Sequence, residues 1–254
     1  MKIEINMGKK EIRLVVTCLV LFEILLVAIF ALDYLLAHPS YTIHKLFDLD
    51  KENTIPTWFA SIQLFVTGGY ILLIPGVIKR EGKNPLQKIF YYLFGFAFIF
   101  LSMDEACSIH EKVNMVIQGH FPGFPHFVNN YGHWVFPYLV ALALFLILVR
   151  KPLLTMWKEC RKEAALILGG IALVILGGIV MEIIGFNFYY SESHKVFYRI
   201  EVVLEEFFEM AGVTLILYGF VLHSLNGKAE VEEPDELTYP IPFPRPEKGV
   251  SKSA

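Results

Sequence analysis

Carboxylic acids occur in segments of this chain that are otherwise apolar, and their spacing could build a metal-binding or proton-carrying site. Glu201, Glu205 and Glu209 recur at every fourth position of the last apolar segment, and Glu182 lies near the end of the segment before it. An ionisable side chain costs about 2.5–3.5 kcal/mol at the centre of a membrane helix, so such residues are rare there and by default indicate a function. These acids therefore predict a site that holds a cation or a proton.

A second polar group ends an earlier apolar segment, where Asp104, Glu105, His110 and Glu111 follow one another closely. If one helix continued to residue 111, Asp104 and Glu111 would share a face with His110 at its edge, because successive residues turn by about 100°. The same geometry turns Glu105 and Glu206 away from the site. We therefore expect Asp104, His110 and Glu111, but not Glu105, to join the acids of the later segments.

The two groups together supply a mixed ligand set of carboxylates and histidine. The candidate metal ligands are Asp104, His110, Glu111, Glu182, Glu201, Glu205 and Glu209. Carboxylates with histidines on facing helices hold the metals of di-iron and di-manganese bundles, but the Glu-x-x-His spacing of those bundles is absent here. A second histidine would have to come from a loop, such as His133 or His194. Iron, zinc, manganese and calcium all fit this set, and a bound metal could activate water or oxygen against a lipid or other apolar substrate.

Two other functions fit the same acids. Glu23 lies near the middle of the first apolar segment, and together with Glu209 it could form a proton path in a proton- or cation-coupled transporter. Alternatively, the acids are neutral or hydrogen-bonded between helices, and they lock the bundle of a structural or accessory subunit of a membrane complex. The sequence does not decide among transport, a structural role and metal binding.

The composition of the whole chain is that of a multi-pass membrane protein. Of its 254 residues, 55% are hydrophobic, and the mean hydropathy is +0.53. We expect an all-α bundle of six transmembrane helices, because six apolar segments can each cross about 30 Å of hydrocarbon. The expected spans lie near 12–37, 57–78, 88–111, 133–150, 164–187 and 198–224. Residues 1–225 would form the transmembrane domain, and residues 226–254 would form a Pro-rich cytoplasmic tail.

The distribution of basic residues predicts the orientation of the bundle. Lysine and arginine are concentrated before the first span and in the second-to-third and fourth-to-fifth connections. The positive-inside rule then places both termini in the cytoplasm and turns the acidic site outward. Lipid would surround the bundle, the tail could bind a protein partner, and the bundle could form a homo-oligomer. No basic patch suited to nucleic acid is visible.

The fifth span contains paired glycines. They occupy positions 169, 170, 177 and 178, before Glu182. Small residues let membrane helices approach closely, so we expect this helix to lie at the centre and Glu182 to lie at a helix contact. The fourth span has few polar residues, which predicts a peripheral, lipid-facing helix.

Three motifs resemble those of a group of uncharacterised bacterial multi-pass membrane proteins. Those proteins combine a Ser-x-Asp-Glu…His-Glu block, here residues 102–111, with a Gly-rich helix that ends in glutamate. Their final helix contains Glu-Glu-x-x-Glu-Met-x-Gly, here residues 205–212. The resemblance covers the third, fifth and sixth spans, implies a multi-pass protein of the bacterial inner (plasma) membrane, and brings no known activity.

Overall fold

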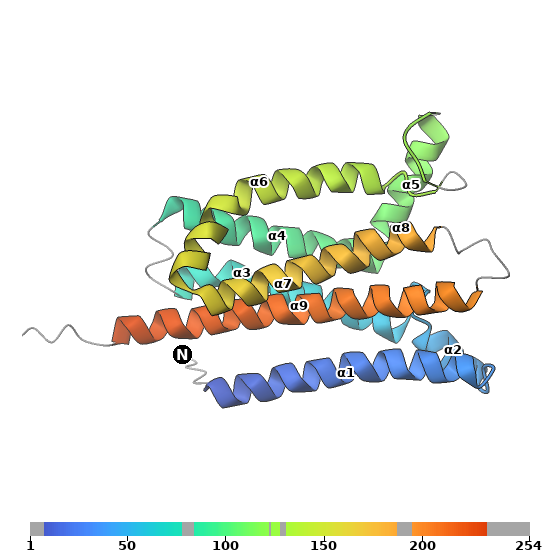
Figure 1. Cartoon of the computed structure of the whole chain (residues 1–254), viewed down its shortest axis with the longest axis horizontal. Helices are drawn as coiled ribbons and strands as arrows, with labels where there is room; N and C mark the ends of the chain where they lie inside the picture. The colour runs from blue at the N-terminus through green and yellow to red at the C-terminus, as the bar shows by residue number, and fades with distance from the viewer. Residues whose placement is uncertain (1–7, 78–83, 122, 128–130, 187–194, 233–254) are drawn as a thin grey trace, which may run out of the picture.

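Long helices lie side by side along most of the chain (Figure 1). The computed structural model describes residues 8–77, 84–121, 123–127, 131–186 and 195–232. The helices are α1 (Lys9–Leu35), α2 (Tyr41–Phe47), α3 (Ile55–Val77), α4 (Pro85–Cys107), α5 (Ile109–His120), α6 (Val135–Glu159), α7 (Arg161–Ile175), the π-helix η2 (Leu176–Met181), α8 (Glu182–Gly185) and α9 (Lys195–Glu232). These described ranges contain helices and no strand.

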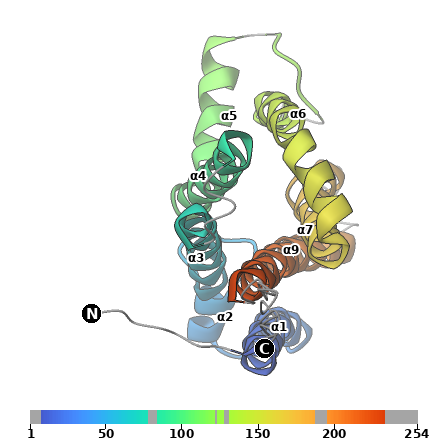
Figure 2. The same ribbon diagram turned by 90° about the vertical axis from the view of Figure 1, so that its left-hand side faces the viewer.

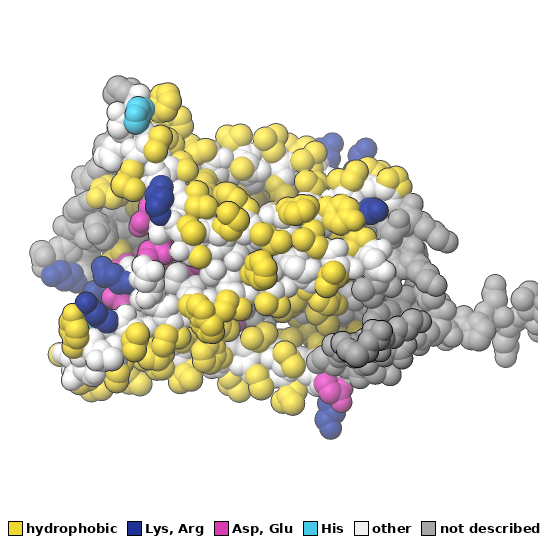
Figure 3. Space-filling model, turned by 180° about the vertical axis from the view of Figure 1, so that it is seen from behind, with side chains coloured by type: hydrophobic (Ala, Val, Ile, Leu, Met, Phe, Trp, Pro, Cys, Tyr) yellow, Lys and Arg dark blue, Asp and Glu magenta, His cyan; other side chains and the backbone are white. Residues whose placement is uncertain are grey.

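Five helical segments are long and apolar enough to cross a membrane. They are α1, α3, α4, α6 and the continuous run from α7 through η2 to α8. Apolar side chains cover much of the surface of the bundle (Figure 3), so the protein is a multi-pass helical membrane protein. α9 lies alongside these helices (Figure 1), but its glutamates make it more polar than they are. The sixth span and the cytoplasmic position of the termini stay predictions.

Helix boundaries differ from the predicted spans at three places. α4 ends at Cys107, before the predicted end at 111, because Ser108 adopts a left-handed conformation with φ 47° and ψ 49°. α6 continues to Glu159, past the predicted end at 150, since a helix can extend beyond the hydrocarbon through polar residues. α9 continues to Glu232, so the predicted boundary at 225 falls within a helix. The remainder of the predicted tail, residues 233–254, lies outside the described residues.

Two closely packed helix pairs form the bundle. Gly68 of α3 faces Gly95 of α4, and Gly170 of α7 faces Gly212 of α9. A Cβ atom on Gly170 would lie 2.5 Å from the carbonyl oxygen of Gly212, so only glycine permits this approach. Figure 2 shows the two pairs on opposite sides of the molecule, with α1 beside α9. The glycines of the fifth predicted span therefore make a close helix contact, as expected. The expected central position was wrong, because α9, which packs against α7, α1 and α3, occupies the centre.

An aromatic core joins the two pairs. Phe94 of α4 packs edge-on against Phe220 of α9, with ring centroids 5.5 Å apart, and both side chains are fully buried. Phe90 and Tyr91 extend the same core. A large cavity begins at Phe94 and continues toward the end of the bundle that carries α2, α5 and α8. The core thus holds the helix pairs together beside the space that contains the acids.

The predicted fourth span corresponds to α6, which lies at the edge of the bundle (Figure 2). Val140, Leu144 and Leu148 of this helix are each more than half exposed. Because these large apolar side chains point away from the protein, lipid is their natural environment. The opposite face of α6 carries Tyr138, which lines the cavity.

Candidate functional site

A cavity of about 970 Å³ lies between the two helix pairs and gathers most of the intramembrane acids. Its ionisable carboxylates and histidine are Asp50, Glu52, Asp104, Glu105, His110, Glu111, Glu182, Glu201, Glu205, Glu206 and Glu209. Its inner wall is apolar, with Phe94, Phe98, Phe145 and Ile216. In Figure 3 acidic side chains are visible in a recess near one end of the otherwise apolar surface. The cavity therefore offers a polar, acidic mouth and an apolar interior.

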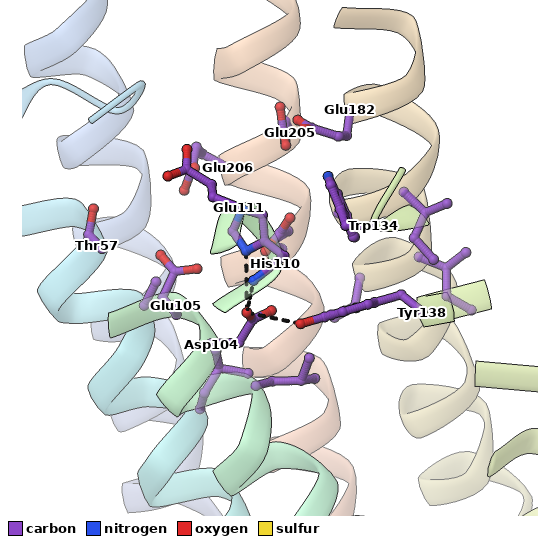
Figure 4. Close-up of a pocket in the computed structure, with 18 of the residues that line it drawn as sticks. Thr57, Asp104, Glu105, His110, Glu111, Trp134, Tyr138, Glu182, Glu205 and Glu206 are labelled. Atoms are coloured by element: carbon purple, nitrogen blue, oxygen red, sulfur yellow. Dashed lines mark hydrogen bonds and ion pairs between the residues drawn. The ribbon is translucent and has the colours of Figure 1, made fainter. Parts of the chain in front are cut away.

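The break between α4 and α5 brings His110 back onto Asp104. The backbone N–H of His110 donates to Asp104 Oδ1 at 2.7 Å, and the His110 ring nitrogen Nδ1 lies 3.3 Å from the same oxygen. Tyr138 of α6 donates its hydroxyl to this oxygen at 3.0 Å, as Figure 4 shows. A continuous helix would have separated the two side chains around its circumference. The left-handed Ser108 instead lets Asp104 fix both the start of α5 and the His110 ring.

Glu52, in the connection between α2 and α3, is a site residue that the helical pattern did not identify. Glu52, His110 and Glu111 place one potential ligand atom each within 4.8 Å of one another. A side-chain hydrogen bond links Glu52 to Ser108, at the helix break. Glu52 lies in a polar connection rather than in an apolar segment, so its sequence position carried no signal for a site.

Burial and charge both act on the groups of this cluster that lie outside the membrane-spanning helices. Burial raises the pKa of Glu52, and the nearby charge of Glu111 raises it further. Burial lowers the pKa of His110, but the hydrogen bond and charge of Asp104, with the charges of Glu182 and Glu111, outweigh that effect and raise the pKa to about 8. The His110 ring is therefore held in a field that favours positive charge.

A second acidic group lies between η2–α8 and α9. Glu205 is hydrogen-bonded through its side chain to both Glu182 and Glu201. Figure 4 shows Glu205 and Glu182 pointing toward each other, above Trp134 in this view. Two carboxyl groups can share a hydrogen bond only when one of them carries a proton. This group is therefore suited to hold a proton or, with its protons removed, a cation.

Glycines of η2 and α8 make room for these acids. A Cβ atom on Gly178 would lie 2.7 Å from Glu209 Oε1, and one on Gly185 would lie 2.8 Å from Glu201 Oε2. η2 is a π-helix, a wider turn that is rare and often occurs at functional sites. The glycine pattern thus allows helix contact at α7 and leaves space for carboxylates at η2 and α8.

All of the predicted metal ligands line this cavity, but they do not form one cluster at ligand distance. Among them, His110 and Glu111 belong to the group with Glu52, whereas Glu182, Glu201 and Glu205 form the hydrogen-bonded group beside α9. Neither loop histidine completes the site in the described structure. His133 is buried against the carbonyl of Pro125 and lies outside the cavity lining, and His194 lies outside the described residues.

Glu105 and Glu206 line the cavity, although the helical pattern turned them away from it. The expectation was wrong because the cavity is broad and borders more than one face of the helices that surround it. α9 lies between α3 and α7 (Figure 2), so side chains of α9 that point about 100° apart can reach the same space.

Glu23 of α1 is fully buried beside the inner end of the cavity. Gln63 Nε2 donates to Glu23 Oε1 at 2.8 Å, and Thr214 Oγ1 donates to the same oxygen at 2.5 Å. Gln63 also lines the cavity. Within the described residues, Glu23 Oε2 has no hydrogen-bond partner. The side-chain amide of Gln63 thus lies between Glu23 and the cavity.

Comparisons with known proteins assign a family and leave its activity open. A search of curated proteins gave no match, and a search of solved structures gave none either. The family model described as "Domain of unknown function (DUF8692)" matches residues 14–224, which include most of the described helices. The chain therefore belongs to the DUF8692 family.

Proposed function

We propose that the cavity binds a divalent transition metal, such as zinc, iron or manganese, through Glu52, His110 and Glu111. The observation that carries this proposal is the placement of their potential ligand atoms within 4.8 Å of one another. Asp104 engages His110 Nδ1, so the other ring nitrogen is available for the metal. Metal-binding histidines commonly have their second nitrogen held by a carboxylate in this way, which fixes the ring and raises its basicity.

The surrounding acids support a cation at this position. Buried carboxylates are stable when they are paired, protonated or bound to a metal. Glu105, Glu206 and Glu209 line the same cavity, and no lysine or arginine forms an ion pair with them among the described residues. A divalent ion would offset part of this concentrated negative charge. Glu205 and Glu182 would then remain as proton acceptors beside it.

We propose further that the protein is a metal-dependent enzyme that acts on a lipid or other apolar substrate. The cavity volume of about 970 Å³ lies at the upper end of the range of about 300–1,000 Å³ for small-molecule sites. Phe98 and Phe145 would contact an apolar chain, while the acidic mouth would receive its polar end. A metal at such a site would supply a bound water of lowered pKa, and Glu205, which lines the cavity and is not among the three proposed ligands, would accept a proton from it.

Metal analysis of the purified protein tests this proposal. The full chain, purified in detergent without a histidine tag and equilibrated with zinc, is expected to bind about one equivalent of zinc in the cavity. Inductively coupled plasma mass spectrometry of the wild type and its variants would measure this equivalent as the difference in total zinc. Glu52→Gln and Glu111→Gln should each lose that equivalent, because an amide oxygen is a much weaker ligand than a carboxylate.

Glu163→Gln is the matched control. Glu163 is also a buried carboxylate, but it accepts a hydrogen bond from Asn226 and lies outside the cavity. The control should keep its full metal content. Unchanged metal in both Glu52→Gln and Glu111→Gln would remove these residues from the site and refute the proposed centre.

A second candidate function is proton- or cation-coupled transport, favoured by the buried position of Glu23. Its contact with Gln63 connects the first helix to the inner end of the acidic cavity. Intramembrane carboxylates in such chains commonly carry protons. Glu209 and Glu23 would then serve as successive proton carriers on either side of Gln63.

Glu23→Gln is expected to abolish metal-driven proton movement in proteoliposomes, because glutamine cannot bind and release a proton at this position. The movement would be followed with an internal pH-sensitive dye after addition of external manganese. Glu11→Gln, an exposed position on the same helix, should leave it unchanged. Equal proton fluxes in the wild type and Glu23→Gln would exclude Glu23 from a proton path.

A further inference from the structure

A group of two histidines and one aspartate lies outside the acidic cavity. Asp33 is in the last turns of α1, His38 follows that helix, and His44 is in α2. The Nδ1 atoms of His38 and His44 lie 2.7 Å and 2.9 Å from Asp33 Oδ2, and the two rings have centroids 4.1 Å apart. None of the three residues lines the cavity, so this group is separate from the proposed centre.

The local backbone holds this group together. The N–H of His38 donates to the carbonyl oxygen of Asp33 at 2.9 Å. Ala37 and His38 both adopt positive φ angles, 57° and 58°, which reverse the chain after α1. Ser40 then caps the first turn of α2 and sets the position of His44. The turn thus directs three side chains from two helices and their connection to one point.

The hydrogen bonds of Asp33 are unevenly distributed. Oδ2 takes both histidine contacts, whereas Oδ1 is buried and has no hydrogen-bond partner among the described residues. The Asp33 side chain is only 5% exposed. A buried carboxylate oxygen without a partner is unfavourable. Coordination of Asp33 Oδ1 to an ion held by the two histidines would give this oxygen a partner. This orphan oxygen is an observation independent of the histidine pair.

We propose that Asp33, His38 and His44 form a second metal site, which takes zinc or a similar divalent transition metal. Two histidines and one carboxylate are the protein ligands of catalytic zinc sites and of non-haem iron sites. The His38 and His44 side chains are 40% and 30% exposed, so water can complete the coordination. The site lies at the end of the bundle that carries α2 and is accessible to ions in solution.

Little rearrangement is needed for an ion to enter. Zinc bonds to nitrogen and oxygen are about 2.0–2.2 Å long, so ligands around a tetrahedral ion lie roughly 3.3 Å apart. The observed nitrogen–oxygen separations of 2.7 Å and 2.9 Å are slightly shorter than that. The partly exposed histidine rings can move outward by a fraction of an ångström, while Asp33 stays fixed in α1.

Zinc titration of the full chain in detergent tests this site. The protein would be stripped with a chelator, equilibrated with zinc, separated from free zinc and analysed for bound equivalents. Asp33→Asn, His38→Gln and His44→Gln should each hold one equivalent less than the wild type. His120→Gln changes an exposed histidine at the end of α5 and should hold as much zinc as the wild type.

The proposed metal site in the cavity and the proposed second site can be refuted separately. The Glu52→Gln/Glu111→Gln double variant should still bind one equivalent of zinc, and adding His44→Gln should remove it. Cobalt(II) in the double variant should give the visible absorption of a histidine-bound ion, which disappears with His44→Gln. If Asp33→Asn, His38→Gln and His44→Gln elute as intact, monodisperse protein and all hold wild-type zinc, the second site is refuted whatever the cavity binds.

Discussion

Asp104→Asn is expected to lower the affinity of the cavity for zinc by about 10–100-fold, the usual effect of losing a carboxylate that orients a metal-binding histidine. Asp104 Oδ1 receives the backbone N–H of His110, its ring nitrogen and the Tyr138 hydroxyl. Asparagine can keep part of this geometry but removes the negative charge that makes the His110 ring more basic. Competition with a zinc-sensitive dye would measure the change in dissociation constant.

Tyr138→Phe is the matched control for that experiment. It removes one hydrogen bond to Asp104 while keeping the carboxylate and its contact with His110. The zinc affinity should therefore change much less than in Asp104→Asn. Equal affinities of Asp104→Asn and the wild type would show that Asp104 does not position the ligand, and equal losses in both variants would point to general disruption of the cavity instead.

Gly170→Ala is expected to destabilise the bundle by about 1–3 kcal/mol, the range for overpacking a closely fitted interior. A Cβ atom at this position would lie 2.5 Å from the Gly212 carbonyl oxygen and 2.6 Å from Ile216 Cγ1. The backbone of α9 cannot move aside without separating the α7–α9 pair. Thermal unfolding in detergent, followed by circular dichroism or by the fluorescence of a thiol-reactive dye, should show a clear decrease in Tm.

Gly169→Ala provides an unusually close control, since it makes the same chemical change at the neighbouring position. No heavy atom lies within 4 Å of a Cβ atom placed there. Alanine also favours a helix over glycine by about 0.5–1 kcal/mol, so the Tm of this variant should stay the same or rise. A similar decrease in both variants, or none in Gly170→Ala, would contradict the close α7–α9 contact.

Several properties of this protein follow from local sequence. Long apolar segments commit the chain to helices, because backbone groups in lipid must be satisfied within each segment. The acids in those segments marked the later cavity, since an ionisable residue is retained there only with a partner or a role. The glycines at 170 and 177 indicated a close helix contact because the absence of a side chain is visible in the sequence itself. Each of these inferences depends on one residue type in one local environment.

The grouping of the site residues was decided by the tertiary structure. Helical periodicity could not show that Ser108 breaks the helix and returns His110 to Asp104, because a single left-handed residue changes the direction of everything after it. It also could not assign Glu52 to His110, since a connection between helices has no periodic pattern that fixes its side chains. Glu105 and Glu206 reached the cavity because two helix pairs enclose a space wider than one helix face. The sequence determined which chemical groups lie in the bundle, and the packing of the helices determined which of them meet.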